Sequence, residues 1–269
     1  MAVLKLDSHG ADVVALQQAL QARGFNPGAP DGDFGPGTEA AVIAFQKSES
    51  LTADGIVGPQ TLDRLGMPAA PSVGRVDVTA NVTAAQVSRM FPQTPISNIK
   101  TNLPFVLQAM SNAGLGDKLM ILMALGTIRA ETASFEPISE GRSRFNTSPN
   151  GHPFDLYDNR RDLGNRGAPD GDRFKGRGFV QLTGRANYTT FSDKLGIGAD
   201  LVDDPEKAND GTIASQLLAL FLKDKEPRIR DALASDDLAA ARKLVNGGSH
   251  GLNDFSDAFR IGERVLPEA

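Results

Sequence analysis

Glu131 and Glu140 stand nine residues apart and offer the paired carboxylates that acid–base chemistry requires. The apolar run from Leu119 to Ile128 predicts a buried helix that ends at Glu131. Partial burial and the negative end of a helix dipole both favour the protonated form of a carboxyl group. Glu131 therefore suits the role of a proton donor, and the plainer alternative is an ion pair with Arg129 or another arginine.

The composition excludes several other kinds of site. Cysteine is absent, which excludes disulfides, thiol nucleophiles and Cys-based zinc sites. Because the chain has only three histidines, we expect no His-rich metal centre and no cofactor. With a formal net charge of −5, the chain lacks the excess of basic residues that is typical of a nucleic-acid binder. Tryptophan is also absent, so a sugar ligand would have to bind without indole rings.

The N-terminal residues carry charge early, at Lys5 and Asp7, and have no apolar core of signal-peptide length. No stretch of the sequence approaches the length of an apolar membrane span. We therefore expect a soluble chain without a signal peptide and without stable membrane insertion, and we expect it to be a monomer.

A change in composition divides the chain. Residues 67–82 are rich in Pro, Ala and small polar residues and have no helical period, which is typical of a linker. We therefore predict a small domain over residues 1–66 and a larger one over residues 83–269. A length of 269 residues also fits two domains.

The small domain contains an internal repeat. Residues 31–38 read Asp-Gly-Asp-Phe-Gly-Pro-Gly-Thr, and residues 54–61 read Asp-Gly-Ile-Val-Gly-Pro-Gln-Thr. In both copies Asp-Gly predicts a turn, and Gly-Pro is typical of a helix start. Helices are expected at 11–23, 37–47 and 59–65, and together they would form a three-helix bundle.

These motifs resemble a known family. Val13–Leu20, Asp31–Gly35, Ala41–Gln46 and Asp54–Pro59 are similar to the three-helix peptidoglycan-binding domain of many cell-wall hydrolases. The resemblance implies bacterial peptidoglycan as the partner of this domain. Most matching residues are expected to build turns and the core, and the core set is Leu16, Leu20, Phe25, Val42, Phe45 and Leu62. The first Asp-Gly turn is the candidate for ligand contact.

The larger domain is predicted to be mainly helical. Helical periods fall at 83–90, 96–113, 118–131, 186–195, 212–223, 227–234, 238–245 and 254–266. Between Phe135 and Thr183 the sequence is rich in Gly, Asn, Asp and Arg and has little helical period. A long irregular segment inside a compact domain usually carries function.

Four elements of the larger domain, in this order, resemble glycoside hydrolase family 19, which includes chitinases and endolysins. They are Glu131–Glu140, Phe174–Tyr188, Val245–Gly248 and Arg260 on a terminal helix. Residues 155–165 resemble the endolysin branch in particular. The resemblance covers roughly residues 95–266. It implies a lysozyme-like α-helical (α+β) domain with a minor β element, so that the whole chain would be mainly α.

The resemblance also implies roles for individual residues. Glu131 matches the general acid, Glu140 the general base that activates water, and Thr183 a hydroxyl that helps to orient this water. Substrate-contact positions are matched by Gln181, Asn187, Tyr188 and Asn246, and a supporting basic position near the carboxylates by Arg260. The family inverts the anomeric configuration, which needs room for water between the two carboxyl groups.

The sequence departs from the plant chitinases of this family in three ways. The second Glu follows after a shorter loop, disulfides are absent, and Ser249-His250 replaces the Glu that follows Asn-Gly-Gly. These departures weaken a preference for chitin and leave rival candidates for the base, namely Glu136, Asp155 and Asp158.

The irregular segment also holds an arginine cluster: Arg142, Arg144, Arg160, Arg161, Arg166, Arg173, Arg177 and Arg185. Acidic residues are interleaved with it, so we expect most of these arginines to pair with acids and to hydrogen-bond the loops. A minority could contact carboxylates on the peptide stems of a cell-wall glycan.

Together, the two resemblances predict a peptidoglycan hydrolase of the endolysin type, which cleaves glycan strands and is directed to the wall by its small domain. The alternatives are a chitinase and a non-catalytic wall-binding or virion structural protein. An endolysin without a signal peptide would be of phage or prophage origin. It would be made in the host cytoplasm and act on the wall after release.

Overall fold

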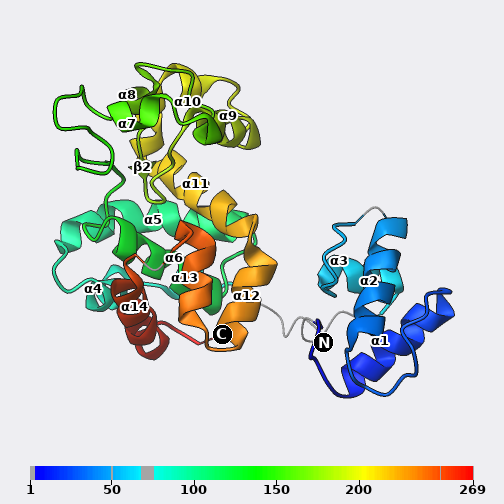
Figure 1. Ribbon diagram of the computed structural model, residues 1–269. Helices are drawn as coiled ribbons and strands as arrows, with labels where there is room; N and C mark the ends of the chain where they lie inside the picture. The colour runs from blue at the N-terminus through cyan, green and yellow to red at the C-terminus, as the bar shows by residue number, and fades with distance from the viewer. Residues whose placement is uncertain (1–3, 50, 68–75, 249, 269) are drawn as a thin grey trace. The chain divides into compact units, whose positions relative to one another are not determined.

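The computed structural model describes residues 4–49, 51–67, 76–248 and 250–268. It divides into two compact units, Met1–Arg75 and Val76–Ala269, which are considered separately (Figure 1). The part that the structure describes is mainly helical, as the sequence predicts. Its one sheet is an antiparallel pair of two-residue strands, β1 (Ile138–Ser139) and β2 (Arg177–Gly178).

The smaller unit contains α1 (Ala11–Ala22), α2 (Pro36–Ser48) and α3 (Pro59–Leu65). α2 and α3 each begin at a proline that follows a glycine in an extended conformation. Proline suits the first helical position, because the N–H that it lacks would have no partner within the helix there. All six residues expected in the core lie there. Five are buried, and the Phe25 ring packs edge-on against the Phe45 ring with 5.4 Å between centroids.

A buried glutamine holds each of the two repeated turns. Gln17 on α1 donates to Asp31 Oδ1 at 2.9 Å and accepts the backbone N–H of Gly32 at 3.0 Å. Gln46 on α2 makes the same pair of contacts to the second copy of the turn. The Asp31 carboxylate, suggested above as a ligand contact, is thus engaged inside the unit. The sequence repeat thus corresponds to two copies of one arrangement, in which a buried glutamine hydrogen-bonds an Asp-Gly turn.

Gln17→Ala should destabilise the smaller unit by about 2–3 kcal/mol, because it leaves buried donors and acceptors of the first turn without partners. Gln18→Ala is the matched control, since Gln18 is exposed on the same helix, and it should change stability by less than about 0.5 kcal/mol. Urea unfolding followed by circular dichroism makes the comparison. Equal unfolding midpoints for the two variants would contradict a stabilising role for the Gln17 hydrogen bonds.

The larger unit has eleven α-helices within its described ranges. They are α4 (Ala84–Met90), α5 (Ile96–Asn112), α6 (Lys118–Glu131), α7 (Asp155–Asp158), α8 (Asp170–Arg173), α9 (Arg185–Lys194), α10 (Asp200–Asp203), α11 (Gly211–Lys223), α12 (Glu226–Ala234), α13 (Leu238–Asn246) and α14 (Leu252–Val265). α6 begins and ends where the sequence predicts, and the other long helices agree within two residues at each end. None of the helices in the described ranges combines the length and the apolar character that crossing a membrane requires.

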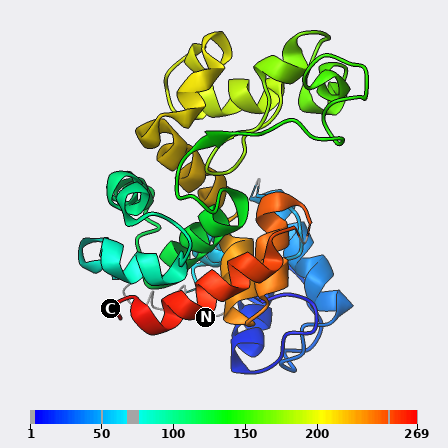
Figure 2. The same ribbon diagram turned by 90° about the vertical axis from the view of Figure 1, so that its left-hand side faces the viewer.

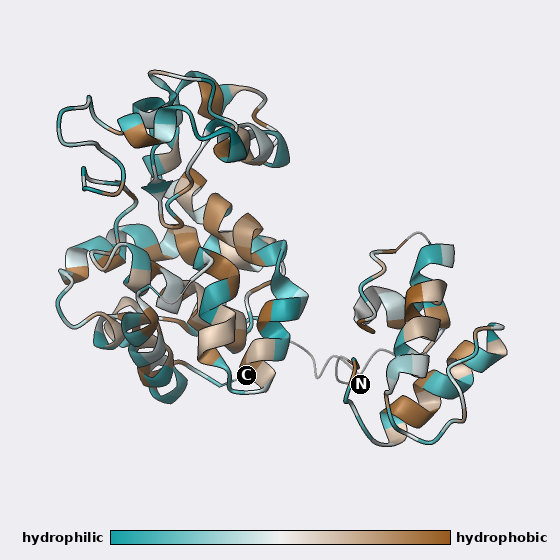
Figure 3. Ribbon diagram, in the orientation of Figure 1, coloured by the Kyte–Doolittle hydropathy of each residue, from teal (hydrophilic) through white to brown (hydrophobic). Residues whose placement is uncertain are grey.

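α6 lies at the centre of the main core, and every residue from Met120 to Ile128 is buried. α14 packs along α6 (Figure 2), and a Cβ at Gly126 would lie 2.9 Å from the Phe255 ring, so only glycine allows this approach. α11, which is largely hydrophobic in Figure 3, joins two cores. It gives Leu218 to the main core and Leu217 to a second core formed with α9 and α10.

The larger unit begins before residue 83. Val78 and Val82 are buried in the main core on either side of a 3₁₀ turn. Asp77 accepts a hydrogen bond from the Ser111 hydroxyl of α5 at 2.6 Å. Residues 76–82, assigned above to the linker, therefore pack against the larger unit, since Val78 and Val82 are buried in its core. Met67 belongs to the core of the smaller unit, and linker residues 68–75 lie outside the described ranges.

Candidate active site

Glu131 is the last residue of α6. Its Oε1 accepts a hydrogen bond from Nη2 of Arg242 at 2.6 Å, and the Arg242 side chain is fully buried. This ion pair joins the end of α6 to α13. Oε2 of Glu131 has no hydrogen-bond partner among the residues that the structure describes, so it is the oxygen that can carry a proton to a ligand.

The loop after α13 lies beside the end of α6. The carbonyl oxygen of His250 accepts hydrogen bonds from Arg242 Nε at 3.1 Å and from Asn246 Nδ2 at 2.8 Å. Gly251 has a φ of +69°, and a Cβ on it would lie 2.9 Å from the Cβ of Ala130. Asn246 therefore shapes a glycine-dependent loop next to the candidate acid, and its amide is already committed to that loop.

Glu140 follows β1, and three donors hold its carboxylate. Oε1 accepts hydrogen bonds from Nδ2 of Asn146 at 2.6 Å and from the Tyr157 hydroxyl at 3.1 Å. Oε2 accepts the backbone N–H of Gly176 at 2.9 Å. These three hydrogen bonds fix the position of the Glu140 carboxylate.

Glu140, Gln181 and Thr183 converge on Gly176. A Cβ at Gly176 would lie 2.7 Å from Glu140 Oε2, 2.8 Å from Gln181 Oε1 and 3.2 Å from Thr183 Oγ1. The Glu140 N–H donates to the Gly176 carbonyl at 2.8 Å, which fixes the two segments against each other. A side chain at residue 176 would therefore collide with these oxygens, so glycine allows the three side chains to approach one another. The structure thus brings together three of the residues that the sequence selected.

α5 fixes the loop that joins Glu131 to β1. Asn98 Nδ2 donates to the Ser134 carbonyl and Asn102 Nδ2 to the Phe135 carbonyl, each at 3.0 Å. Phe135 is fully buried although its φ is +57°. The irregular segment between the two carboxylates is therefore tied to the helical core at its start.

Two predicted substrate-contact residues have other partners. Tyr188 is 0% exposed, and its hydroxyl donates to the Lys175 carbonyl at 2.8 Å and accepts from Arg177 Nη1 at 3.1 Å. From this position it supports β2 and cannot touch a glycan. Asn187 is exposed, and its amide donates to the Thr183 carbonyl at 2.8 Å, beside the point of convergence.

Arg260 is not placed at the acid. Its guanidinium pairs with Asp236 at 2.5 Å and with Glu263 at 3.0 Å. The buried Arg242 supplies the positive charge at Glu131 instead. The ion pair with another arginine, given above as the plainer alternative for Glu131, is therefore present. Arg242 itself was not predicted, since it stands 111 residues from its partner, and the available signal is its position on the apolar face of α13.

The rival carboxylates differ from the predicted base in their surroundings. Glu136 is exposed, and no described residue hydrogen-bonds its side chain. Asp155 accepts hydrogen bonds from the hydroxyl and the N–H of Ser148, which hold the pKa of Asp155 below its usual value. Asp158 is buried and pairs with His152 Nε2 at 2.9 Å. Asp158 also accepts the N–H of Gly171 at 2.9 Å, so Asp155 and Asp158 each have two such contacts and Glu140 has three.

Both tyrosines of the chain lie in this region, and both should ionise at a higher pH than an exposed tyrosine does. Burial raises the pKa of Tyr188 to about 12. Burial and the Glu140 charge raise the pKa of Tyr157 to about 12. Because folding raises both pKa values above the ordinary 10.0, the stability that they contribute is present below pH 10 and is lost as the pH rises toward 12.

An ultraviolet titration tests this, since the chain has no tryptophan to obscure two tyrosines. The native midpoint should lie near 12, and the urea-unfolded midpoint near 10. Glu140→Gln should lower the midpoint of Tyr157 more than that of Tyr188, because Glu140 is hydrogen-bonded to Tyr157 and acts on Tyr188 only through its charge. A native protein that titrates like the unfolded one would refute the burial of both rings.

Most of the arginine cluster is used inside the larger unit. Arg160 pairs with Asp162, Arg177 with Glu206 and Arg185 with Asp170, while Arg161 and Arg173 donate to backbone carbonyls. Arg142, Arg144 and Arg166 form no ion pair within the described ranges. The structural role expected for most of the cluster is therefore seen, and three members are left over.

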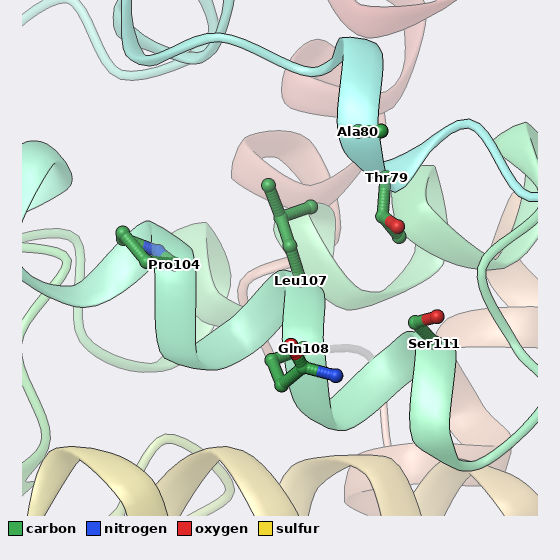
Figure 4. A pocket seen from close by; sticks show the side chains of 6 residues that line it. All are labelled: Thr79, Ala80, Pro104, Leu107, Gln108 and Ser111. Carbon is green, nitrogen blue, oxygen red and sulfur yellow. The ribbon is translucent and has the colours of Figure 1, made fainter.

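A separate hollow of about 260 Å³ is lined by Thr79, Ala80, Pro104, Leu107, Gln108 and Ser111 (Figure 4). None of the candidate site residues lines it. Across the described ranges, no three His, Asp or Glu side chains lie together in a way that could hold a metal ion.

Residues 9–65 match the family described as "Putative peptidoglycan binding domain". The chain is 47% identical over 57 residues to the N-acetylmuramoyl-L-alanine amidase CwlM of Mycobacterium tuberculosis, which covers 21% of this chain and 14% of that protein. It is 40% identical over 63 residues to the spore cortex-lytic enzyme of Bacillus cereus, which covers 23% of this chain and 24% of that enzyme. The chain thus spans less than a quarter of the length of either relative.

Two solved structures are similar at low scores. Chitinase C from Streptomyces griseus has a TM-score of 0.48 and 20% identity, covering 70% of this chain and 79% of that one. The endolysin of Burkholderia AP3 phage has a TM-score of 0.27 and 21% identity, covering 97% of this chain and 99% of that one. The family match lies within the smaller unit.

Proposed function

We propose that the chain is a peptidoglycan hydrolase that cleaves glycan strands by inverting acid–base hydrolysis. The convergence of Glu140, Gln181 and Thr183 at Gly176 is the observation that supports this most directly. The two carboxylates also have different surroundings. Glu131 contacts one buried cation and keeps one oxygen without a described partner, whereas three donors hold Glu140. We assign the acid role to Glu131 because one of its oxygens is open to a ligand, and the base role to Glu140 because it lies beside Gln181 and Thr183.

Glu131 is the general acid in this mechanism. Its Oε2 gives a proton to the glycosidic oxygen, and the leaving sugar departs as an alcohol. Oε1 stays bound to Arg242, which stabilises the negative charge that appears on Glu131 as the proton leaves. The ion pair is therefore strongest after proton transfer, and this is the condition under which binding energy accelerates a reaction.

Glu140 is the general base. It takes a proton from a water molecule, and the oxygen of this water bonds to the anomeric carbon on the face opposite the leaving group. Thr183 Oγ1 and Gln181 Oε1 lie near Glu140 Oε2 around Gly176, and we infer that they help to orient this water. Each turnover leaves one proton on Glu140 and removes one from Glu131, and exchange with solvent restores both.

The smaller unit supplies the targeting. Residues 9–65 match a peptidoglycan-binding family, and the relatives that share short stretches with the chain include an amidase and a spore cortex-lytic enzyme. A binding module on an insoluble polymer raises the local concentration of the attached catalytic unit without any new contact at the reacting bond.

The same module occurs beside other chemistry, because one relative is named as an amidase. Mass spectrometry of digested peptidoglycan separates the possibilities. We expect new reducing ends within the glycan, and we expect the first product seen by NMR to have the inverted anomeric configuration. Freed stem peptides without new reducing ends would overturn glycosidase action. Wall binding without any product would indicate a non-catalytic wall-binding protein.

A further inference from the structure

The turn that follows Glu140 is built around one buried amide. Asn146 is 2% exposed, and its Nδ2 donates to Glu140 Oε1 at 2.6 Å and to the Gly141 carbonyl at 2.9 Å. Its Oδ1 accepts the N–H of Ser143 at 2.8 Å. Residues 141–147, here called the basic turn, therefore form one hydrogen-bonded structure with the proposed base.

The basic turn presents two arginines and an aromatic ring to solvent. Phe145 is 73% exposed, and the Arg144 guanidinium lies over its ring at 4.9 Å from the centroid. A guanidinium stacked on a ring keeps its N–H edge open to a carboxylate. Arg142 is also exposed and forms no ion pair with any described residue.

No acid offsets these charges within the turn itself. Residues 141–147 contain two arginines and no Asp or Glu. The next acid along the chain, Asp155, is hydrogen-bonded to Ser148. Figure 1 shows the green loop between β1 and α7 standing out from the helices. A pair of exposed arginines that forms no ion pair within the described ranges, beside a proposed base, is suited to bind an anion next to the bond that is cut.

We propose that Arg142 and Arg144 form a subsite for carboxylates on the substituents of the glycan, and that this subsite makes peptidoglycan the preferred substrate over neutral chitin. The inference rests on the proposed glycosidase function and specifies its substrate. Peptidoglycan carries carboxylates on its lactyl groups or on the stem peptides attached to them, whereas chitin carries none. The Phe145 ring holds the Arg144 guanidinium in place for this contact.

The test compares soluble peptidoglycan strands with the same strands after their carboxylates are converted to neutral amides. Amidation should lower the wild-type cleavage rate about five- to tenfold, because two exposed Arg–carboxylate contacts are lost. In the double variant Arg142→Gln/Arg144→Gln the two substrates should be cleaved at equal rates. Arg228→Gln, an exposed arginine on α12, is the matched control and should keep the wild-type ratio.

The two sources of carboxylate are separated by strands treated with an amidase, which removes the stem peptides and leaves the lactyl carboxylates. Loss in the double variant on peptide-bearing strands alone assigns the subsite to the stem, and loss on amidase-treated strands alone assigns it to the lactyl carboxylate, which is free only after the stem is removed. Loss on both shows that the subsite accepts either carboxylate. An equal effect of amidation on wild type and double variant would overturn the subsite. Absence of cleavage of every strand by the wild type would instead refute the proposed function.

Discussion

Glu131→Gln should lower the rate of cell-wall hydrolysis about 10²–10⁴-fold, which is the usual contribution of a general acid. Glutamine keeps the shape of the side chain, and its carbonyl can still accept the hydrogen bond from Arg242, but it has no proton to give. Turbidity loss of permeabilised Gram-negative cells measures the rate. Sedimentation with purified walls should be unchanged, because the smaller unit is intact.

This substitution also leaves the buried Arg242 without a counter-charge, which is destabilising. Circular dichroism at the assay temperature must therefore show that the variant is folded before its activity is read. A folded Glu131→Gln protein that lyses cells at close to the wild-type rate would show that another residue is the acid.

Glu140→Gln should reduce hydrolysis by about 10²–10⁴-fold as well, for a different reason. The amide cannot accept a proton, and its NH₂ group would face one of the donors that now point at the carboxylate: Asn146, Tyr157 or the Gly176 N–H. The water beside Thr183 would then be held without being activated.

Glu136→Gln is the matched control for the base. Glu136 is exposed and stands four residues earlier in the same segment, without a described hydrogen bond, so its loss should change the rate less than twofold. If Glu136→Gln abolishes activity and Glu140→Gln does not, the two assignments must be exchanged.

Local signals in the sequence were sufficient for the long helices. α6 was predicted to the residue from its apolar run, and the structure shows that the Asp117 carboxylate caps this helix by accepting the N–H of Met120. Pro36 and Pro59 marked the starts of α2 and α3 in the same way. These features depend on residues within a few positions of one another, which is the range over which a pattern can be read.

The remainder depends on contacts between distant parts of the chain. α7, α8 and α10 are four residues long and show no period. The burial of Tyr188 follows from its bond to Arg177, and the choice of Arg242 rather than Arg260 at Glu131 depends on how α13 packs against α6. Glu140, Gln181 and Thr183 were selected by resemblance. Their convergence on Gly176 required the structure.

The two proposed catalytic carboxylates lie in segments of unequal stability. Glu131 ends a helix whose interior is buried, whereas Glu140 is held by the Asn146 hydrogen bonds of a turn whose residues 141–145 are exposed. Exposed, hydrogen-bonded segments open at a lower free energy than a packed core. On heating, activity should therefore be lost at a lower temperature than helical structure. Substitutions intended to raise the working temperature of this protein should therefore be made in the basic turn and not in the core.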